Sequence, residues 1–381
     1  MMSALEYVEI RSGSTRELLG LIDNAKSILW SPSYYGAGYV EIYAPCSSSV
    51  VGILTEGNLI TRADEPNVGI IERVQIVYNS IEGRMILATG RFLKSILDRR
   101  VIYKMSGNSV SATVLRGNVE DAARKLVSEN AISCAFDSDR NITDLELGES
   151  SGTTETIIDS NASSAEKQVT YKGLLEYTDA LLEEYGLGAR ISLSSARKMQ
   201  YIVYKGVDRS VDNTDGNEPV IFSQDFDNLV SSDYSYSTEL LKNAALIGGE
   251  GEGLERFCTT VSNSSKTGLS RRETFVDASR ISRKYKDDDD VEQTLTDAQY
   301  ESQLLTLGKQ ELATMSIVET FNGTIDITKS MVQYGYGKDF YLGDITTIQD
   351  VDIGLYINAR ILTVTERKDD DGYNVEIEFG L

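Results

Sequence analysis

The sequence contains no histidine, and this absence excludes several kinds of active site. Ser-His-Asp and Cys-His catalysis need an imidazole base, while histidine zinc sites and the H-E-x-x-H helix need imidazole ligands. Cysteine is also scarce, since Cys46, Cys134 and Cys258 lie far apart and form no C-x-x-C pair. An odd, sparse set of this kind predicts reduced thiols, buried as small hydrophobic side chains, and no disulfide framework.

Long apolar runs and an excess of basic residues are missing as well. No run of 18 apolar residues occurs, and the first residues have neither the basic nor the apolar region of a signal peptide. We therefore expect a protein made in a cytoplasm, with no membrane segment. The 381 residues include 37 Lys and Arg against 59 Asp and Glu, which gives a net charge of −22. Because an acidic surface repels phosphate backbones, we expect no stable nucleic-acid binding.

Glycine and tyrosine are abundant, with 31 Gly and 21 Tyr against only 4 Pro. This composition favours strands joined by glycine turns. Alternation with period two predicts strands over 39–44 and 70–78, and capping residues predict helices after Asn118, over 174–185 and after Thr296. Further expected elements are strands at 84–89, 201–204, 220–222, 244–247 and through much of 317–381, helical turns at 91–97, and an exposed loop at 148–168.

An internal repeat links the two ends of the chain. The segment 57–61 (GNLIT) is followed, 16 residues after its glycine, by 73–77 (RVQIV). The segment 343–347 (GDITT) is followed, 17 residues after its glycine, by 360–364 (RILTV). A glycine turn and one more strand come next in both units. The repeat predicts a duplicated small barrel with helical material inserted between the copies, the alternative being two unrelated β-meanders that match by chance.

Several segments resemble ligand sites only superficially. Gly248–Gly253 lacks the Lys-Ser/Thr and the following helix of a phosphate loop, so we expect a turn. The acidic runs 287–290 and 369–371, and the segment 212–216, lack the ligand spacing of an EF-hand and are predicted to be solvated loops. A glycosidase-type carboxylate pair has little support, because Trp30 lies in a predicted core strand and not on a sugar-binding platform. We therefore assign no catalytic, cofactor or metal residue and no cofactor.

The candidate structural or interface residues are few. Gly57 and Gly343 are expected at equivalent turns of the repeat, where a side chain is disfavoured. Arg271 and Arg272 stand beside Glu273 at strand spacing. A buried ion pair and an exposed edge strand with charged residues both fit this last pattern.

Short strings along nearly the whole chain, in the same order, carry a resemblance to a known family. They are Trp30–Pro45 (WSPSYYGAGYVEIYAP), Gly69–Glu72, Gly90–Leu93 with Leu97–Arg100, Tyr204–Ser210, Phe222-Ser223 with Asp227–Leu229, Lys242-Asn243 with Gly248–Gly253, Arg271–Glu273 with Val276-Asp277, and Leu342–Ile345. The pattern resembles the siphovirus tail hub proteins, which are similar to the central hub of contractile-phage baseplates. The sequence departs from that pattern in a long acidic insert around 284–296.

The resemblance implies an α+β, β-rich fold with two homologous small β-barrels and α/β insertions between them. The implied domains are a first tube-type barrel at 1–112, an α/β insertion at 113–196 and a second barrel at 317–381. Between the last two lies a strand-rich middle region, 197–316, with the acidic insert and the long helix, part of which can complete the second barrel. The family assembles as a homotrimer at the end of the tail tube.

The implied function is structural and not enzymatic. The protein is expected to lie at the tail tip or baseplate of the virion, to terminate the tail tube, and to adapt its six-fold symmetry to a three-fold tip. Its implied partners are a distal tail or tube-end ring, the tape measure, and tip, spike or receptor-binding proteins. Two alternatives stay open: a tail-associated cell-wall or polysaccharide hydrolase, marked by converging carboxylates, and a receptor-binding tail module, marked by aromatic-rich loops.

Overall fold

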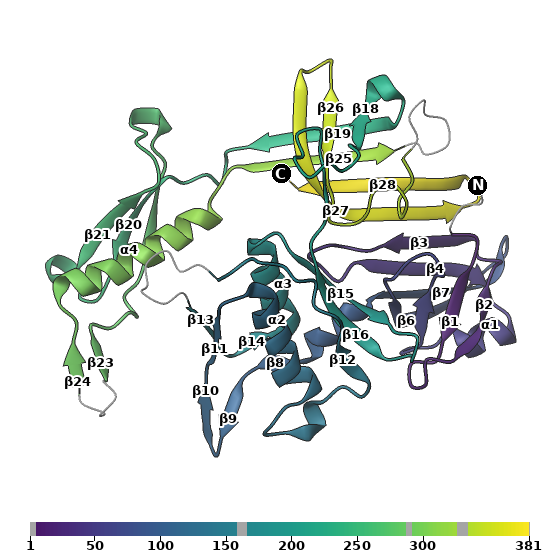
Figure 1. The fold of residues 1–381 in the computed structure, drawn as a ribbon, viewed down its shortest axis with the longest axis horizontal. Coiled ribbons are helices and arrows are strands. Elements are labelled where there is room, and N and C mark those ends of the chain that lie inside the picture. Colours follow the sequence, from purple (N-terminus) through teal and green to yellow (C-terminus); the bar gives the residue numbers. More distant parts are fainter. Residues whose placement is uncertain (1–4, 158–165, 287–291, 326–333, 381) are drawn as a thin grey trace. The chain divides into compact units, whose positions relative to one another are not determined.

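The computed structural model describes residues 5–157, 166–286, 292–325 and 334–380. Its contacts divide the chain into two compact units. Unit 1 comprises Met1–Asp233 and Phe321–Leu381, and unit 2 comprises Tyr234–Thr320. The fold is α+β and rich in strands, as the sequence predicts (Figure 1).

The N-terminal part of unit 1 is a strand assembly in the order β3-β4-β7-β6-β5-β1-β2. Alternation places Ile28, Trp30 and Ile42 on its buried face, where Val8 and Ile22 join the same apolar cluster. Alternate residues of these strands therefore face the core, as expected for a sheet with one covered face. The elements are β1 (Val8–Arg11), β2 (Leu18–Ile22), β3 (Ser27–Ser31), β4 (Tyr39–Pro45), α1 (Ser48–Ile53), β5 (Leu59–Thr61), β6 (Gly69–Asn79) and β7 (Gly83–Phe92).

The C-terminal part of unit 1 is a second strand assembly in the order β19-β25-β28-β27-β26. The short strands β17 and β18 pair with β26 in parallel. Its core contains Phe222, whose ring centroid lies 5.4 Å from that of Phe340 and 5.7 Å from that of Phe379. The elements are β17 (Asp208–Arg209), β18 (Ile221–Ser223), β19 (Leu229–Ser237), β25 (Val318–Ile325), β26 (Ile345–Asp350), β27 (Leu355–Asp369) and β28 (Gly372–Gly380).

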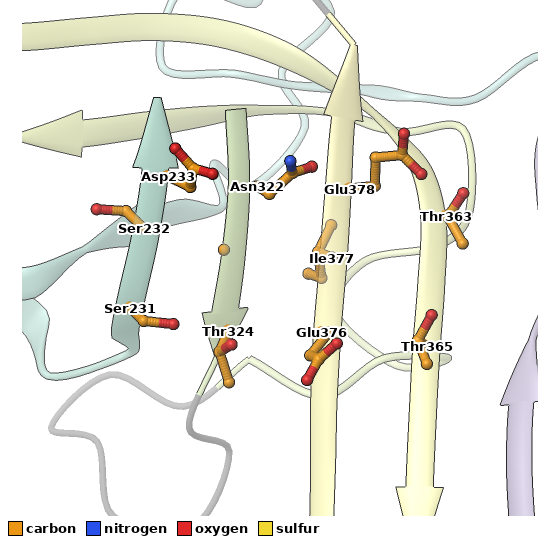
Figure 2. A pocket seen from close by; sticks show the side chains of 11 residues that line it. Ser231, Ser232, Asp233, Asn322, Thr324, Thr363, Thr365, Glu376, Ile377 and Glu378 are labelled. Carbon is orange, nitrogen blue, oxygen red and sulfur yellow. The ribbon is translucent and has the colours of Figure 1, made fainter. Parts of the chain in front are cut away.

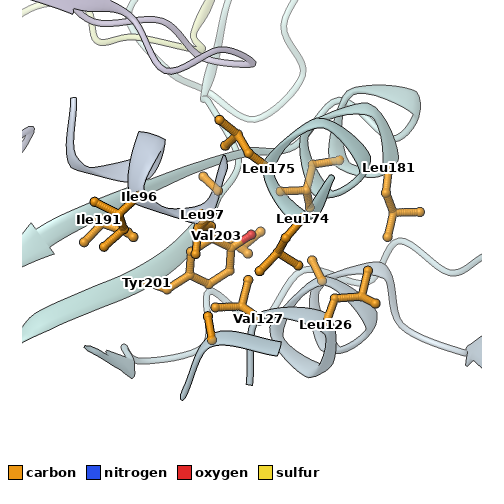
Figure 3. Close-up of a cluster of buried hydrophobic side chains, with 14 of the residues drawn as sticks. Ile96, Leu97, Leu126, Val127, Leu174, Leu175, Leu181, Ile191, Tyr201 and Val203 are labelled. Carbon is orange, nitrogen blue, oxygen red and sulfur yellow. The ribbon is translucent and has the colours of Figure 1, made fainter. Parts of the chain in front are cut away.

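An α/β region with its own apolar core lies between the two strand assemblies in sequence (Figure 3). Leu126 and Val127 of α2 face Leu174 and Leu181 of α3, and the ring of Tyr201 of β16 lies beside them in the same cluster. The α2 helix begins as predicted, because the Asp121 backbone N–H donates to Asn118 Oδ1 at 3.0 Å. The elements are η1 (Leu93–Arg99), β8 (Val101–Ile102), β9 (Lys104–Ser106), β10 (Ser109–Ser111), β11 (Thr113–Arg116), α2 (Val119–Val127), η2 (Ser128–Ile132), η3 (Ser138–Arg140), β12 (Leu145–Leu147), β13 (Glu166–Val169), β14 (Lys172–Gly173), α3 (Leu174–Glu184), β15 (Gly188–Leu193) and β16 (Met199–Tyr204).

The loop predicted at 148–168 is partly wrong. Residues 148–157 are irregular apart from one bridge, between Asn118 and Thr156, and residues 158–165 lie outside the described part of the chain. The last residues instead form β13, which pairs with β11 from Thr113↔Val169 to Arg116↔Glu166. The polar residues of β13 predicted a loop. A two-stranded sheet that is exposed on one side can nevertheless contain Glu, Lys and Gln, so a strand forms here.

Unit 2 is a three-stranded sheet in the order β21-β20-β22, covered on one face by α4. Thr296 opens the helix with a capping box, as its side chain accepts from the Gln299 N–H while Gln299 reaches back to the Thr296 N–H. Tyr300 and Leu304 of α4 pack on Ile247 of β20. The elements are β20 (Ala244–Gly248), η5 (Gly253–Glu255), β21 (Cys258–Ser262), η6 (Gly268–Ser270), β22 (Glu273–Asp277), β23 (Lys284–Lys286), β24 (Glu292–Thr294) and α4 (Asp297–Thr314), and η4 (Gln224–Phe226) precedes β19 in unit 1.

Candidate functional site

The two strand assemblies of unit 1 are joined into one sheet. Strand β3 of the first pairs with β27 of the second, from Trp30↔Glu366 to Ile28↔Lys368. The Ser31 and Thr365 hydroxyls complete the joint on the exposed face, 2.7 Å apart. Including the short strands beside β26, the strands of these two assemblies form one sheet of 14 strands.

One face of this sheet is mostly polar across the joint. On β3, Ser27, Leu29 and Ser31 lie on this face while Ile28 and Trp30 are buried. The same face continues over β27, β28, β25 and β19 as a shallow depression of ≈ 590 Å³ (Figure 2). Its lining is Ser231, Ser232, Asp233, Asn322, Gly323, Thr324, Thr363, Thr365, Glu376, Ile377 and Glu378.

The lining of this depression is polar and carries three acidic side chains. Asp233, Glu376 and Glu378 are all exposed, so none of these carboxylates lies in a buried setting. The lining holds no aromatic side chain on which a sugar ring can stack. Hydroxyls and solvated carboxylates instead make a surface that repels anionic polymers.

The repeat predicted from the sequence is present in the strands. The order β3-β4-β7-β6-β5 in the first part matches β19-β25-β28-β27-β26 in the second, and both sets follow the same order along the chain. A bulge interrupts β6 between Ile71 and Arg73, and another interrupts β27 between Ile361 and Thr363. The strands beyond differ, since β1 is antiparallel to β5 whereas β17 and β18 are parallel to β26.

Gly57 and Gly343 hold equivalent places in these two units. Their φ angles are +83° and +93°, in the region that favours glycine. The Gly57 N–H donates to the Ile71 carbonyl at 2.8 Å, and the Gly343 N–H donates to the Ile361 carbonyl at 2.9 Å. In each unit the glycine therefore stands at a turn that leads into a strand.

A second glycine presses against each of these turns. A Cβ on Gly13 would lie 2.0 Å from the Gly57 carbonyl oxygen, and a Cβ on Gly206 would lie 1.8 Å from that of Gly343. Only glycine permits such close backbone contact. This explains why Gly206 and Gly343 occur in two of the strings that carry the family resemblance.

A buried ion pair lies at the joint between the two assemblies, and the sequence analysis missed it. Arg62 Nη1 contacts Glu366 Oε2 at 2.5 Å, and both side chains are 2% exposed. The guanidinium also pairs with Asp64 at 2.7 Å and lies 5.3 Å from the Trp30 ring centroid. The Tyr373 hydroxyl donates to Glu366, and burial raises the pKa of this tyrosine well above its ordinary value. No spacing in the sequence relates Arg62 to a residue 304 positions away.

Tyr34 forms a second buried contact between distant segments. Its hydroxyl lies 3.1 Å from the Gly186 carbonyl oxygen and accepts from the Gly206 N–H at 3.2 Å. A Cβ on Gly343 would lie 2.3 Å from the ring, so the glycine is needed on this side as well. Burial raises the pKa of Tyr34 to about 12, with the Arg360 guanidinium opposing the shift.

Asp344 holds the strings 204–210 and 342–345 together. Its carboxylate accepts from the Val207 N–H at 2.8 Å and from Arg209 Nε at 2.9 Å. The side chain is almost fully buried, so these charge-assisted bonds replace its hydration. The strings were visible in the sequence, but the role of this aspartate was not.

The structure places the Arg271–Glu273 candidates at an exposed strand. Arg271 Nε pairs with Glu273 Oε1 at 2.6 Å, and both side chains are well exposed. Arg272 is half-buried and donates to the carbonyl and hydroxyl oxygens of Thr238. Strand β22 pairs only with β20 among the described strands, so the edge-strand alternative describes it and a buried ion pair does not.

The other sequence predictions are resolved in part. All three cysteines are free, but only Cys134 is buried; Cys46 is half-buried and Cys258 is exposed, so the expectation of three buried thiols is wrong. Cys258 lies on β21, whose face opposite α4 is uncovered within unit 2. Gly248–Gly253 forms the predicted turn, and residues 369–371 form the β27–β28 hairpin turn. The acidic run 287–290 lies outside the described residues.

The described residues contain neither a membrane-spanning helix nor a cluster of metal-ligating side chains. None of these helices is both long and apolar enough to cross a membrane. Within the same ranges, no group of three or more acidic or cysteine side chains is arranged to hold a metal ion.

Two solved structures share the fold. A tail protein from Neisseria meningitidis MC58 superposes with a TM-score of 0.54 at 14% identity, covering 98% of this chain and 96% of its own. The prophage MuSo2 43 kDa tail protein from Shewanella oneidensis superposes with a TM-score of 0.58 at 12% identity, covering 98% of each chain. No curated protein matches the sequence.

The sequence also matches one family model over nearly its full length. The match runs over residues 7–381, and the family is described as the Siphovirus ReqiPepy6 Gp37-like protein. The sequence and the phage-tail fold agree with the resemblance to siphovirus tail hub proteins. The chain therefore belongs to the Siphovirus ReqiPepy6 Gp37-like protein family.

Proposed function

We propose that this chain is a structural tail hub, which terminates a siphovirus tail tube as a homotrimer. The observation that carries the proposal is the duplication in unit 1. Two five-strand units of the same order are joined at β3 and β27 into one continuous sheet. Three copies of such a chain supply six similar units, the number that a six-fold tube end presents.

The same arrangement explains how the hub adapts symmetry. Each strand unit forms a small barrel that faces one subunit of the tube-end ring, while the segments inserted between the units repeat only three times around the axis. The tube side is then pseudo-six-fold and the opposite side is three-fold. The proposed partners are the distal tail or tube-end ring, the tape measure, and the tip, spike or receptor-binding proteins.

The polar face supports a position around the tail channel. A wall of hydroxyls and solvated carboxylates such as Glu376 and Glu378 repels DNA at short range and gives it nothing to bind. The tail proteins that share this fold support a place in the tail, and the family supports a siphovirus virion.

Averaged end-on images of assembled tails test the proposal. A hub of this kind shows six similar densities around the channel at the level of the sheets and three-fold density below them. Strict six-fold symmetry at both levels contradicts it. A zymogram of the purified chain on peptidoglycan and surface polysaccharide tests the hydrolase alternative, because clear lytic activity contradicts a purely structural role.

A further inference from the structure

The outer half of β6 is an open strand edge with apolar side chains. Strand β5 reaches only Gly69 and Ile70, and β7 pairs with the whole of β6 from the other side. No described strand pairs with the remaining edge beyond Arg73. The side chains of Val74, Ile76 and Tyr78, which point to the core side of the sheet, are 37%, 49% and 73% exposed. Such an edge invites pairing with another strand.

The equivalent half of β27 is covered. The matched bulges place Arg73 level with Thr363, so Val74 and Ile76 correspond to Val364 and Glu366. Val364 is 0% exposed and Glu366 is 1% exposed. They are buried because β3 pairs with this half of β27 and brings Trp30 and its core with it.

A free strand equivalent to β3 exists at the opposite end of the sheet. Strand β19 occupies the place in its unit that β3 occupies in the first, and its described partner is β25 alone. Its residues Val230–Asp233 are exposed. Ser231 and Asp233 lie on the polar face beside Thr324 and Asn322 (Figure 2), as Ser27 and Leu29 lie beside Tyr43 and Glu41 in the first unit.

We infer that the outer half of β6 pairs, antiparallel, with β19 of a second copy of this chain. The contact repeats between copies the β27–β3 contact that the chain makes within itself, and it rests on the proposed trimer. Because Arg367 pairs with Leu29, the matching residues are Val77 and, in the second copy, Asp233. Each copy has one β6 edge and one β19 edge, so the contact is head-to-tail, and three such contacts close the proposed trimer.

Cysteine cross-linking tests the register. Val77→Cys and Asp233→Cys are combined in one chain in which Cys46→Ser and Cys258→Ser remove the more accessible thiols. Oxidation of assembled tails and of the concentrated chain is expected to give covalent dimers and trimers in both samples. Leu29→Cys with Arg367→Cys is the matched control, and it is expected to give a disulfide within one chain. Each single variant is expected to give no dimer, since the contact is heterologous.

A substitution at the edge tests whether the pairing holds the ring together. Ile76→Asp is expected to abolish the trimer and leave the melting temperature of the monomer within about 2 °C. Val351→Asp, also at an exposed apolar residue, is the control and is expected to leave the trimer intact. If wild-type tails contain a trimer that survives Ile76→Asp, or in which residues 77 and 233 do not cross-link, this pairing is wrong although the hub proposal stands. If wild-type tails contain no trimer, both fail.

Discussion

The two strand units of this chain are alike in order and unlike in what covers them. In the C-terminal unit, β27 is paired along its outer half by β3, and Val364 and Glu366 are fully buried. In the N-terminal unit, the matching half of β6 has one open edge and exposes Val74 and Ile76. Duplicated units in one chain give one internal joint and leave two ends unpaired. Under the proposed pairing, the open half of β6 is where a neighbouring copy binds.

Breaking the internal joint is expected to have the largest effect. Glu366→Ala leaves Arg62 buried without its main partner, which costs about 3–5 kcal/mol of unfolding free energy. Denaturant unfolding of the purified chain measures this loss. Lys26→Ala removes the exposed pair with Asp370 at the same joint and serves as the control, with an expected loss below about 1 kcal/mol. Equal losses for the two variants contradict the account of the joint.

The equivalent glycines Gly57 and Gly343 are expected to differ in how much an alanine substitution destabilises the two units. Gly343→Ala meets both a left-handed backbone and the Tyr34 ring, so a loss of about 2–4 kcal/mol is expected. Gly57→Ala has the same backbone strain but open space for its Cβ, so about 1–2 kcal/mol is expected. Thermal unfolding of the two variants measures the difference, and a larger loss at Gly57 refutes it.

A buried ion pair lies where β7 of the N-terminal unit leads into η1. There Lys94 pairs with Asp179 of α3 at 2.9 Å, and burial raises the pKa of Asp179 to about 6, with Lys94 opposing the shift. A carboxyl whose pKa is higher in the folded chain than in the unfolded chain binds more protons when folded. Stability from this group is therefore lost as pH rises from about 4 to about 6.

Asp179→Asn removes that titration. Between pH 4 and pH 6, we expect the wild type to lose on the order of 2 kcal/mol more unfolding free energy than the variant loses. Chemical denaturation at pH 4, 5 and 6 measures the slopes. Asp98→Asn, at an exposed carboxyl paired with Arg91, is the control. Identical slopes for the wild type and Asp179→Asn count against a raised pKa.

The smallest expected effect concerns charge on the polar face. Glu376 and Glu378 of the C-terminal unit correspond to Leu87 and Thr89 of the N-terminal unit. Because both glutamates are exposed, Glu376→Gln with Glu378→Gln is expected to change stability by less than about 0.5 kcal/mol. The wild-type chain is expected to show no shift of duplex DNA in a low-salt gel. Micromolar binding there disproves a repelling channel wall.

The sequence was most informative where a residue acts locally. Period-two alternation identified β4, the turn at Gly83 identified the start of β7, and the caps at Asn118 and Thr296 identified α2 and α4, because each signal lies within a few residues. The spacing of glycines also identified the repeat. The Arg62–Glu366 pair, the Tyr34 contacts and the role of Asp344 were not predictable, since they depend on segments that only folding brings together. The prediction that Cys258 is buried was wrong. Cysteine is usually buried, and only the folded sheet shows that this face of β21 is uncovered.

The copy number at the tail tip tests the central claim most directly. Native mass measurement of isolated tips is expected to find three copies of this chain, each contributing two strand units to a ring of six. Two copies or six copies per tip contradict the account, because neither number makes a six-unit ring from a chain with two units.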